Sequence, residues 1–150
     1  SSMPQLGAYI LHRLWEVDQV VQKCIKNFDF HYMFVTLLNF CSNDLSAFYF
    51  DIRKDCIYCD SKDDIKRRSS RTVLKLLFDH LVRWFAPSIV FTAEEAWKEI
   101  GNKSSIHLEE FLRTPSYYNN KELQPVAEYI FYETGASVEE QKKNLKKLKK

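Results

Sequence analysis

The fold is decided by the stretch LGAYILHRLWEVDQVVQKCIKNF, residues 6–28. Its apolar side chains recur at steps of three and four residues, which places them on one face of an α-helix. That face holds Leu6, Ile10, Leu14, Val17, Val21, Cys24 and Phe28. Charged residues such as Arg13 and Lys23 occupy the other side. The stretch therefore predicts an amphipathic helix whose apolar face packs against further helices.

A second helical pattern follows after a short turn. Asn27 or Asp29 can cap the new helix, and apolar residues then continue with the same period. They are Phe30, Met33, Phe34, Leu37, Leu38, Cys41, Leu45 and Phe48. A short turn between two amphipathic helices favours an antiparallel hairpin in which the apolar faces meet.

A third helix is predicted beyond a polar connection. Residues 51–64 break the helical period and gather aspartates, so we interpret them as a solvent-exposed segment. The helical pattern resumes near Asp63 and ends before Pro87, because proline disfavours helix in the residue before it. The later half of this helix is apolar almost all round, and we expect it at the centre of a bundle. Its predicted core side chains include Leu77 and Trp84.

The remaining residues predict one short helix and an irregular end. Residues 92–95, TAEE, have the form of a capping box, so a short helix should run to about Ile100, where Gly101 stops it. From Asn102 to Asn120 the chain is polar and rich in turn residues, and we expect mostly loop with one extended piece at residues 106–108. The predicted fold is therefore all-α, an antiparallel helical bundle with a partly irregular C-terminal segment.

Length and composition indicate a folded, soluble domain. A chain of 150 residues is the usual size of one domain, and 45% hydrophobic residues are too many for a disordered chain. No apolar run is long enough to span a bilayer, and the start lacks the pattern of a signal peptide. We therefore expect a cytosolic protein with no membrane partner. Ser1 and Ser2 ahead of Met3 resemble the remains of an expression tag, so residues 1–3 are set aside.

Positive charge is concentrated in one helical patch. The net charge is +2, but six lysines fall in the last nine residues, and the rest carries 16 basic against 20 acidic side chains. An anion site on the body must therefore be local. The patch is formed by Lys66, Arg67, Arg68, Arg71 and Lys75, with no acid between them. Arginine offers paired donors to phosphate oxygens, although a solvated helix face partly neutralised by nearby aspartates explains the same charges.

Exposed aromatic residues are a second candidate feature. His31, Tyr32, Tyr49 and Tyr58 fall off the main apolar stripes and near helix ends or connections. Such rings can stack on the unpaired bases of RNA. Tyrosines on a bundle surface also commonly cover the core, so packing is the favoured interpretation of each ring taken alone.

Motifs for catalysis or metal binding are absent or incomplete. With three glycines there is no phosphate-binding loop, and neither H-E-x-x-H nor G-x-S-x-G occurs. Cys56 and Cys59 form a C-x-x-C pair, but a zinc site needs a second ligand pair, and none is evident. We therefore predict no catalytic residue and no metal ligand, with a metal or redox module built on Cys56 and Cys59 as one alternative.

Two long runs carry a resemblance to a known family. They are FDFHYMFVTLLNFCSNDLSAFYFDIRKDCIYCD, residues 28–60, and RRSSRTVLKLLFDHLVRWFAPSIVFTAEEAW, residues 67–97. Together they resemble the anticodon-binding helical domain of bacterial isoleucyl-tRNA synthetases. The resemblance extends over residues 5–111, including residues 105–108, SIHL, and Phe111. The valyl and leucyl enzymes share the general bundle, and the segment of residues 51–60 is what favours the isoleucyl family.

The resemblance implies a function for the chain within a larger enzyme. Such synthetases use ATP, with magnesium, to join isoleucine to its tRNA, and many bacterial relatives carry a C-terminal zinc module. The HIGH and KMSKS signatures of the catalytic domain are absent here, as are the editing domain and the zinc module. The chain is then expected to be a non-catalytic part of the enzyme, with a bundle over residues 4–111 and a segment, residues 112–150, to which the resemblance gives no role.

The expected partners are an isoleucine tRNA and the remaining domains of the synthetase. Basic residues should contact RNA phosphates: Lys66, Arg67, Arg68, Arg71 and Lys75, with Arg53 and Lys54 in the preceding connection. Aromatic residues should lie near unpaired bases: His31, Tyr32 and Tyr49. The alternatives are a helical protein-interaction module without RNA binding and the equivalent domain of a valyl or leucyl synthetase.

Overall fold

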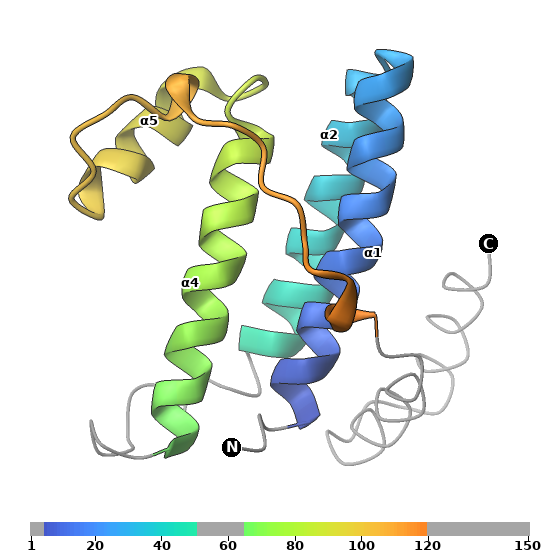
Figure 1. Ribbon diagram of the computed structural model, residues 1–150, viewed down its shortest axis with the longest axis vertical. Coiled ribbons are helices and arrows are strands. Elements are labelled where there is room, and N and C mark those ends of the chain that lie inside the picture. The colour runs from blue at the N-terminus through green and yellow to red at the C-terminus, as the bar shows by residue number, and fades with distance from the viewer. Residues whose placement is uncertain (1–4, 51–64, 120–150) are drawn as a thin grey trace.

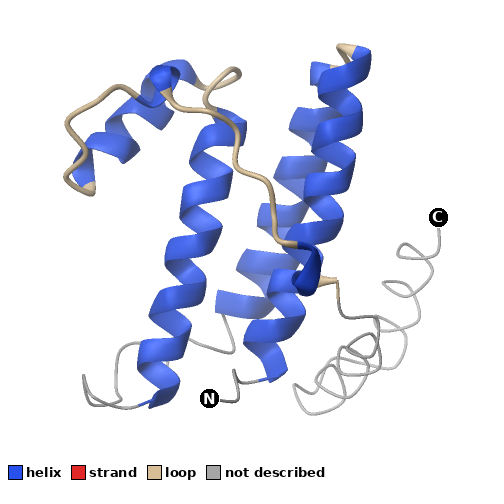
Figure 2. Ribbon diagram, in the orientation of Figure 1, coloured by secondary structure: helices blue, strands red, loops and turns tan. Residues whose placement is uncertain are grey.

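A computed structural model gives the fold of the chain and describes residues 5–50 and 65–119 (Figure 1). These residues form helices joined by loops, with no strand among them (Figure 2). The all-α prediction is confirmed. None of the helices in the described ranges has both the length and the apolar character that crossing a membrane requires.

Three long helical rods run side by side. α1 (Gln5–Asn27) leads into α2 (Phe30–Asn39), which continues as the π-helix η1 (Phe40–Phe50) and runs back along α1 (Figure 1). α4 (Ile65–Phe85) points the same way as α1 and contacts both α1 and α2. The predicted antiparallel hairpin is therefore confirmed, and α1 lies at the centre of the packing.

The main hydrophobic core lies between these rods. Its fully buried side chains come from all of them and include Ile10, Leu14, Val21, Met33, Leu37, Tyr49 and Trp84. Leu77 is also buried, so the two core residues predicted in the third helix are confirmed. Phe28 was wrongly placed on the apolar face of the first helix, because it lies beyond the end of α1 and is exposed. Phe30 and Leu38 are exposed as well.

A smaller unit packs on the end of α4. α5 (Val90–Glu99), together with the 3-10 turn η2 (Ile106–Leu108), forms a second core cluster around Trp97. α4 ends at Phe85, before Pro87, as predicted. Gly101 follows α5 with a φ of 92°, a conformation that glycine adopts without strain, so the predicted stop is confirmed.

Two local predictions in this unit are wrong. α5 begins after Ile89 and makes no side-chain cap bond, so Thr92 lies within the helix and forms no capping box. Glu94 instead accepts hydrogen bonds from the Ser105 hydroxyl at 2.8 Å and from the Ile106 amide at 2.9 Å. These bonds hold residues 106–108 in a 3-10 turn, where an extended piece was expected.

Residues 109–119 form an irregular segment that packs across the bundle, and we call this segment the strap. After η2 the chain runs back across the helices to α1 and forms a 3-10 turn, η3 (Ser116–Tyr118), against it (Figure 1). Asp18 of α1 is fully buried and accepts hydrogen bonds from the Thr114 amide at 3.0 Å and the Thr114 hydroxyl at 2.8 Å. Phe111 and Tyr118 pack against the main core. The packing of the bundle therefore continues beyond residue 111, where the resemblance ended.

Candidate nucleic-acid interface

The basic patch lies on the first turns of α4. Arg68, Arg71 and Lys75 are exposed there, and we call these three residues the α4 basic face. Steps of three and four residues place them on one side of the helix. The opposite side of the same turns is buried through Ser70 and Val73. The core contacts of α4 therefore direct the three basic side chains outward.

The other predicted basic residues differ in their surroundings. Arg67 is only partly exposed and has an interaction of its own within the fold, so it is a weaker candidate for a ligand contact. Lys66 belongs to α4, but its side chain lies outside the described part. Arg53 and Lys54 also fall outside the described residues, so their predicted role is not addressed by the structure.

Two partly buried arginines, Arg13 and Arg83, are paired with carboxylates within the protein. Arg13 donates to Asp44, with 3.0 Å between Nε and Oδ1, and also to Glu16. Burial pulls the pKa of Arg13 down, but Asp44 and Glu16 raise it by more, so the guanidinium stays charged. Arg83 contacts Glu109 at 3.2 Å and lies over the Trp97 ring. Within the described ranges, the residues of the α4 basic face have no ion pair of this kind, which leaves their charges available to an external anion.

The predicted aromatic contacts divide into exposed and buried rings. His31 and Tyr32 are exposed in the first turn of α2, with 55% of Tyr32 accessible. Tyr49 is 0% exposed, so the prediction that it reaches unpaired bases is wrong. It lies in η1, where the wider turn of a π-helix shifts which residues face the core. Tyr58 lies outside the described residues.

The structure separates the basic and aromatic candidates. α2 begins at the end of the bundle where α4 finishes, since the rings of Phe34 and Phe85 lie 5.9 Å apart (Figure 1). The α4 basic face lies near the other end of α4. A helix rises about 1.5 Å per residue, so roughly 25 Å of helix separates Arg68 from Phe85. The two sets of residues therefore form two surfaces.

The turn between α1 and α2 holds an aromatic residue that sequence reasoning misplaced. Phe28 has a φ of 56° and is 81% exposed, and its ring meets that of Phe30 edge to face at 6.4 Å. Asp29 caps α2 by accepting a hydrogen bond from the Tyr32 amide at 3.1 Å, which confirms one of the two predicted caps. A signal was present in the sequence, because Phe28 stands between the turn-forming residues Asn27 and Asp29.

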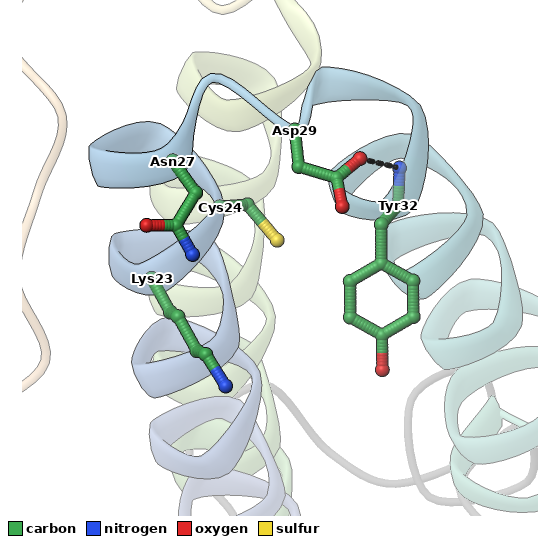
Figure 3. A pocket seen from close by; sticks show the side chains of 5 residues that line it. All are labelled: Lys23, Cys24, Asn27, Asp29 and Tyr32. Atoms are coloured by element: carbon green, nitrogen blue, oxygen red, sulfur yellow. Dashed lines mark hydrogen bonds between the residues drawn. The ribbon is translucent and has the colours of Figure 1, made fainter.

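A hollow of about 200 Å³ lies beside this turn. Lys23, Cys24 and Asn27 line it from α1, and Asp29 and Tyr32 line it from the start of α2 (Figure 3). The Cys24 sulfur points toward the space between the two helices (Figure 3). Burial raises the pKa of the Cys24 thiol, so the group is a neutral thiol and not a reactive thiolate.

The described residues contain no cluster of three or more side chains that could hold a metal ion. The C-x-x-C pair, Cys56 and Cys59, lies outside them, so the prediction about zinc stays a prediction. The buried carboxylate of Asp18 is used within the fold, where it accepts a hydrogen bond from the Thr114 hydroxyl. The arrangement is suited to binding an anionic or aromatic ligand on its surface.

A family comparison identifies the class of domain. The model of the family described as the anticodon-binding domain of tRNA ligases matches residues 7–150. The chain belongs to this family. The matched range includes the α4 basic face, the turn between α1 and α2, and the segment after residue 111.

Curated relatives in this family are isoleucine–tRNA ligases. The chain is 47% identical over 122 residues to the enzyme of Pelagibacter ubique, 48% identical over 122 residues to that of Ruegeria pomeroyi, and 44% identical over 131 residues to that of Agrobacterium fabrum. These alignments cover 81%, 80% and 87% of this chain but only 14%, 12% and 14% of the relatives. The anticodon-binding domain therefore corresponds to a small part of each of those enzymes.

Proposed function

We propose that the chain is the part of an isoleucine–tRNA ligase that holds the anticodon arm of isoleucine tRNA. The match of residues 7–150 to the anticodon-binding family, together with relatives named as isoleucine–tRNA ligases, carries this proposal. The family match disfavours the alternative of a protein-interaction module without RNA binding. The relatives also favour the isoleucine enzyme over the valine and leucine enzymes.

The α4 basic face supports the proposal with a binding mechanism. Arg68, Arg71 and Lys75 would contact phosphates along one RNA strand and release the counterions held there. Phosphate contacts of this kind orient the RNA without reading its sequence. Discrimination between tRNAs would then depend on contacts to unpaired bases, for which His31 and Tyr32 are exposed.

Catalysis would be carried out by other parts of that enzyme. This sequence has neither the HIGH nor the KMSKS signature, so ATP and magnesium would bind outside it, as would zinc in a C-terminal module. Aminoacylation is a step of protein synthesis, and we infer a cytoplasmic location from that role. The domain would contribute by placing the tRNA so that its acceptor end reaches the catalytic centre.

The proposal is tested by comparing two RNAs in a binding titration. One is isoleucine tRNA, and the other is the same tRNA with its anticodon bases replaced. Each lost base contact is worth about 1–3 kcal/mol, so the altered tRNA should bind at least roughly fivefold more weakly. The titration is run with the chain and with the synthetase that carries it. Equal affinity for both RNAs in both settings would contradict anticodon binding.

A further inference from the structure

The turn between α1 and α2 presents three large aromatic rings to solvent within five residues. They are Phe28, Phe30 and Tyr32, and we call them the aromatic tip. His31 is exposed between them, and Lys23 and Lys26 are exposed on the last turns of α1. Folding ordinarily hides rings of this size, because burial of aromatic area is a main source of stability. Their exposure together at one end of the bundle therefore needs another explanation.

The backbone conformation of Phe28 is a second, independent indication that this residue is not placed for the stability of the fold. The Asp29 amide donates to the Cys24 carbonyl at 2.9 Å and the Phe28 amide donates to the Ile25 carbonyl at 3.3 Å, which is the Schellman pattern of a helix end. Phe28 occupies the left-handed position of this pattern, where glycine or asparagine is usual. A bulky residue there is strained, and its exposed ring gains little from packing. Local stability thus favours a different residue at this position.

The chemistry around the tip fits a nucleobase. Exposed rings provide flat faces for base stacking, and the cations of Lys23 and Lys26 complement a phosphate backbone. The hollow beside the tip adds polar groups at its rim, including the Asn27 amide and the Tyr32 hydroxyl (Figure 3). An amide supplies both a donor and an acceptor, which matches the edge of an unpaired base.

We propose that the aromatic tip is a stacking site for an unpaired nucleobase of the bound RNA, with Phe28 as its principal ring. This inference rests on the proposed function, because that function supplies the RNA. Stacking adds affinity without releasing counterions, whereas the α4 basic face acts through charge. The two surfaces lie at opposite ends of the bundle, so substitutions at one leave the other intact (Figure 1).

The test uses Phe28→Gly, which removes the ring and suits the left-handed backbone. The affinity of the synthetase for isoleucine tRNA should fall roughly 5- to 150-fold, the range expected for one lost base stack. The melting temperature should stay the same or rise, because the strain at residue 28 is relieved. Tyr32→Ala provides a second ring deletion. The matched control is Tyr117→Ala, which removes an exposed ring on η3 and should leave affinity unchanged.

A second measurement, fluorescence, reports directly on the stacking of a base in the anticodon loop. A fluorescent base analogue placed in the anticodon loop should lose emission when it stacks on the wild-type protein and keep it with Phe28→Gly. Unchanged affinity and unchanged emission in both tip variants, with the wild type still binding RNA, would overturn the stacking site alone and indicate a protein-facing role for the tip. Absence of RNA binding by the wild type would overturn the proposed function as well.

Discussion

At the scale of single residues, Asp18 shows how one buried carboxylate secures an irregular segment. Its side chain is 0% exposed and receives two hydrogen bonds from Thr114 and one from Gln22 at 3.1 Å. A buried charge is tolerated only when it is hydrogen-bonded in this way. The contact joins residues that are far apart in the sequence, so it ties the strap to the middle of α1.

Removing one of these bonds should weaken the fold. Thr114→Val keeps the size of the side chain but removes the hydroxyl donor, and a hydrogen bond to a charged group contributes about 1.5–3 kcal/mol. Urea denaturation should show a loss of that size. Thr72→Val is the matched control, because the Thr72 hydroxyl is exposed and bonds only within its own helix. An equal loss in both variants would show that the Asp18 contact has no special role.

A second carboxylate gives a pH-dependent prediction. Hydrogen bonds from Lys98 and Ser105, and from the Ile106 amide, lower the pKa of Glu94 to about 2. An unfolded glutamate titrates near about 4.3, so the ionised side chain stabilises the folded state above that pH and the contribution is lost as pH falls toward about 2.

Glu94→Gln should therefore melt at a lower temperature than the wild type near neutral pH. The difference should shrink as pH falls from about 4.3 toward about 2, because the wild type then loses its charge too. Thermal unfolding followed by circular dichroism over this range measures the difference. A gap that stayed constant across the range would contradict the assigned role of the Glu94 charge.

At the scale of the helices, α4 combines a side buried in the core with an exposed basic side. Leu77 is buried between α4 and the other rods, and Leu77→Ala should cost about 2–5 kcal/mol in the free energy of unfolding. Leu108→Ala removes the same atoms from an exposed side chain and should have little effect. Chemical denaturation of the two variants compares them. Equal stabilities would mean that α4 does not pack as described.

The regular helices were predictable from sequence because their packing repeats with the helical period. α1 and α4 keep apolar residues at steps of three and four, and the α4 basic face follows from the same spacing. Tyr49 was misplaced because a change to π-helical geometry leaves no local pattern in the sequence. Phe28 was misplaced because an apolar residue at the expected step also fitted the helix, although it adopts the turn conformation.

Contacts between distant residues account for the other errors. Thr92 was expected to cap the next helix in a capping box, but α5 has no side-chain cap bond. The partners of Glu94, Ser105 and Ile106, lie in a loop whose path no periodicity encodes. The same holds for the bond between Thr114 and Asp18. The shared helix face of Arg68 and Arg71 could be predicted because both lie on one regular helix, but the position of this candidate site relative to Tyr32 required the assembled bundle.

At the scale of the whole molecule, two surfaces of different character lie at opposite ends of one bundle (Figure 1). The α4 basic face offers charge, and the aromatic tip offers stacking. Outside its lysine-rich end the chain carries more acidic than basic side chains, so an RNA contact on that part would depend on local basic patches and not on overall charge. This arrangement predicts that salt dependence and base dependence can be altered separately.

The most direct test of the central claim is the salt dependence of tRNA binding by the variant with Arg68→Gln and Arg71→Gln. Each lost phosphate contact should reduce the magnitude of the log-log salt slope by about 0.7–0.9, so the double variant should lose about 1.4–1.8 and bind more weakly. The control carries Lys103→Gln, which removes a positive charge at an exposed position beyond α5. We predict a flattened slope only in the first variant. Unchanged affinity and slope in that variant, or equal flattening in both, would contradict the account.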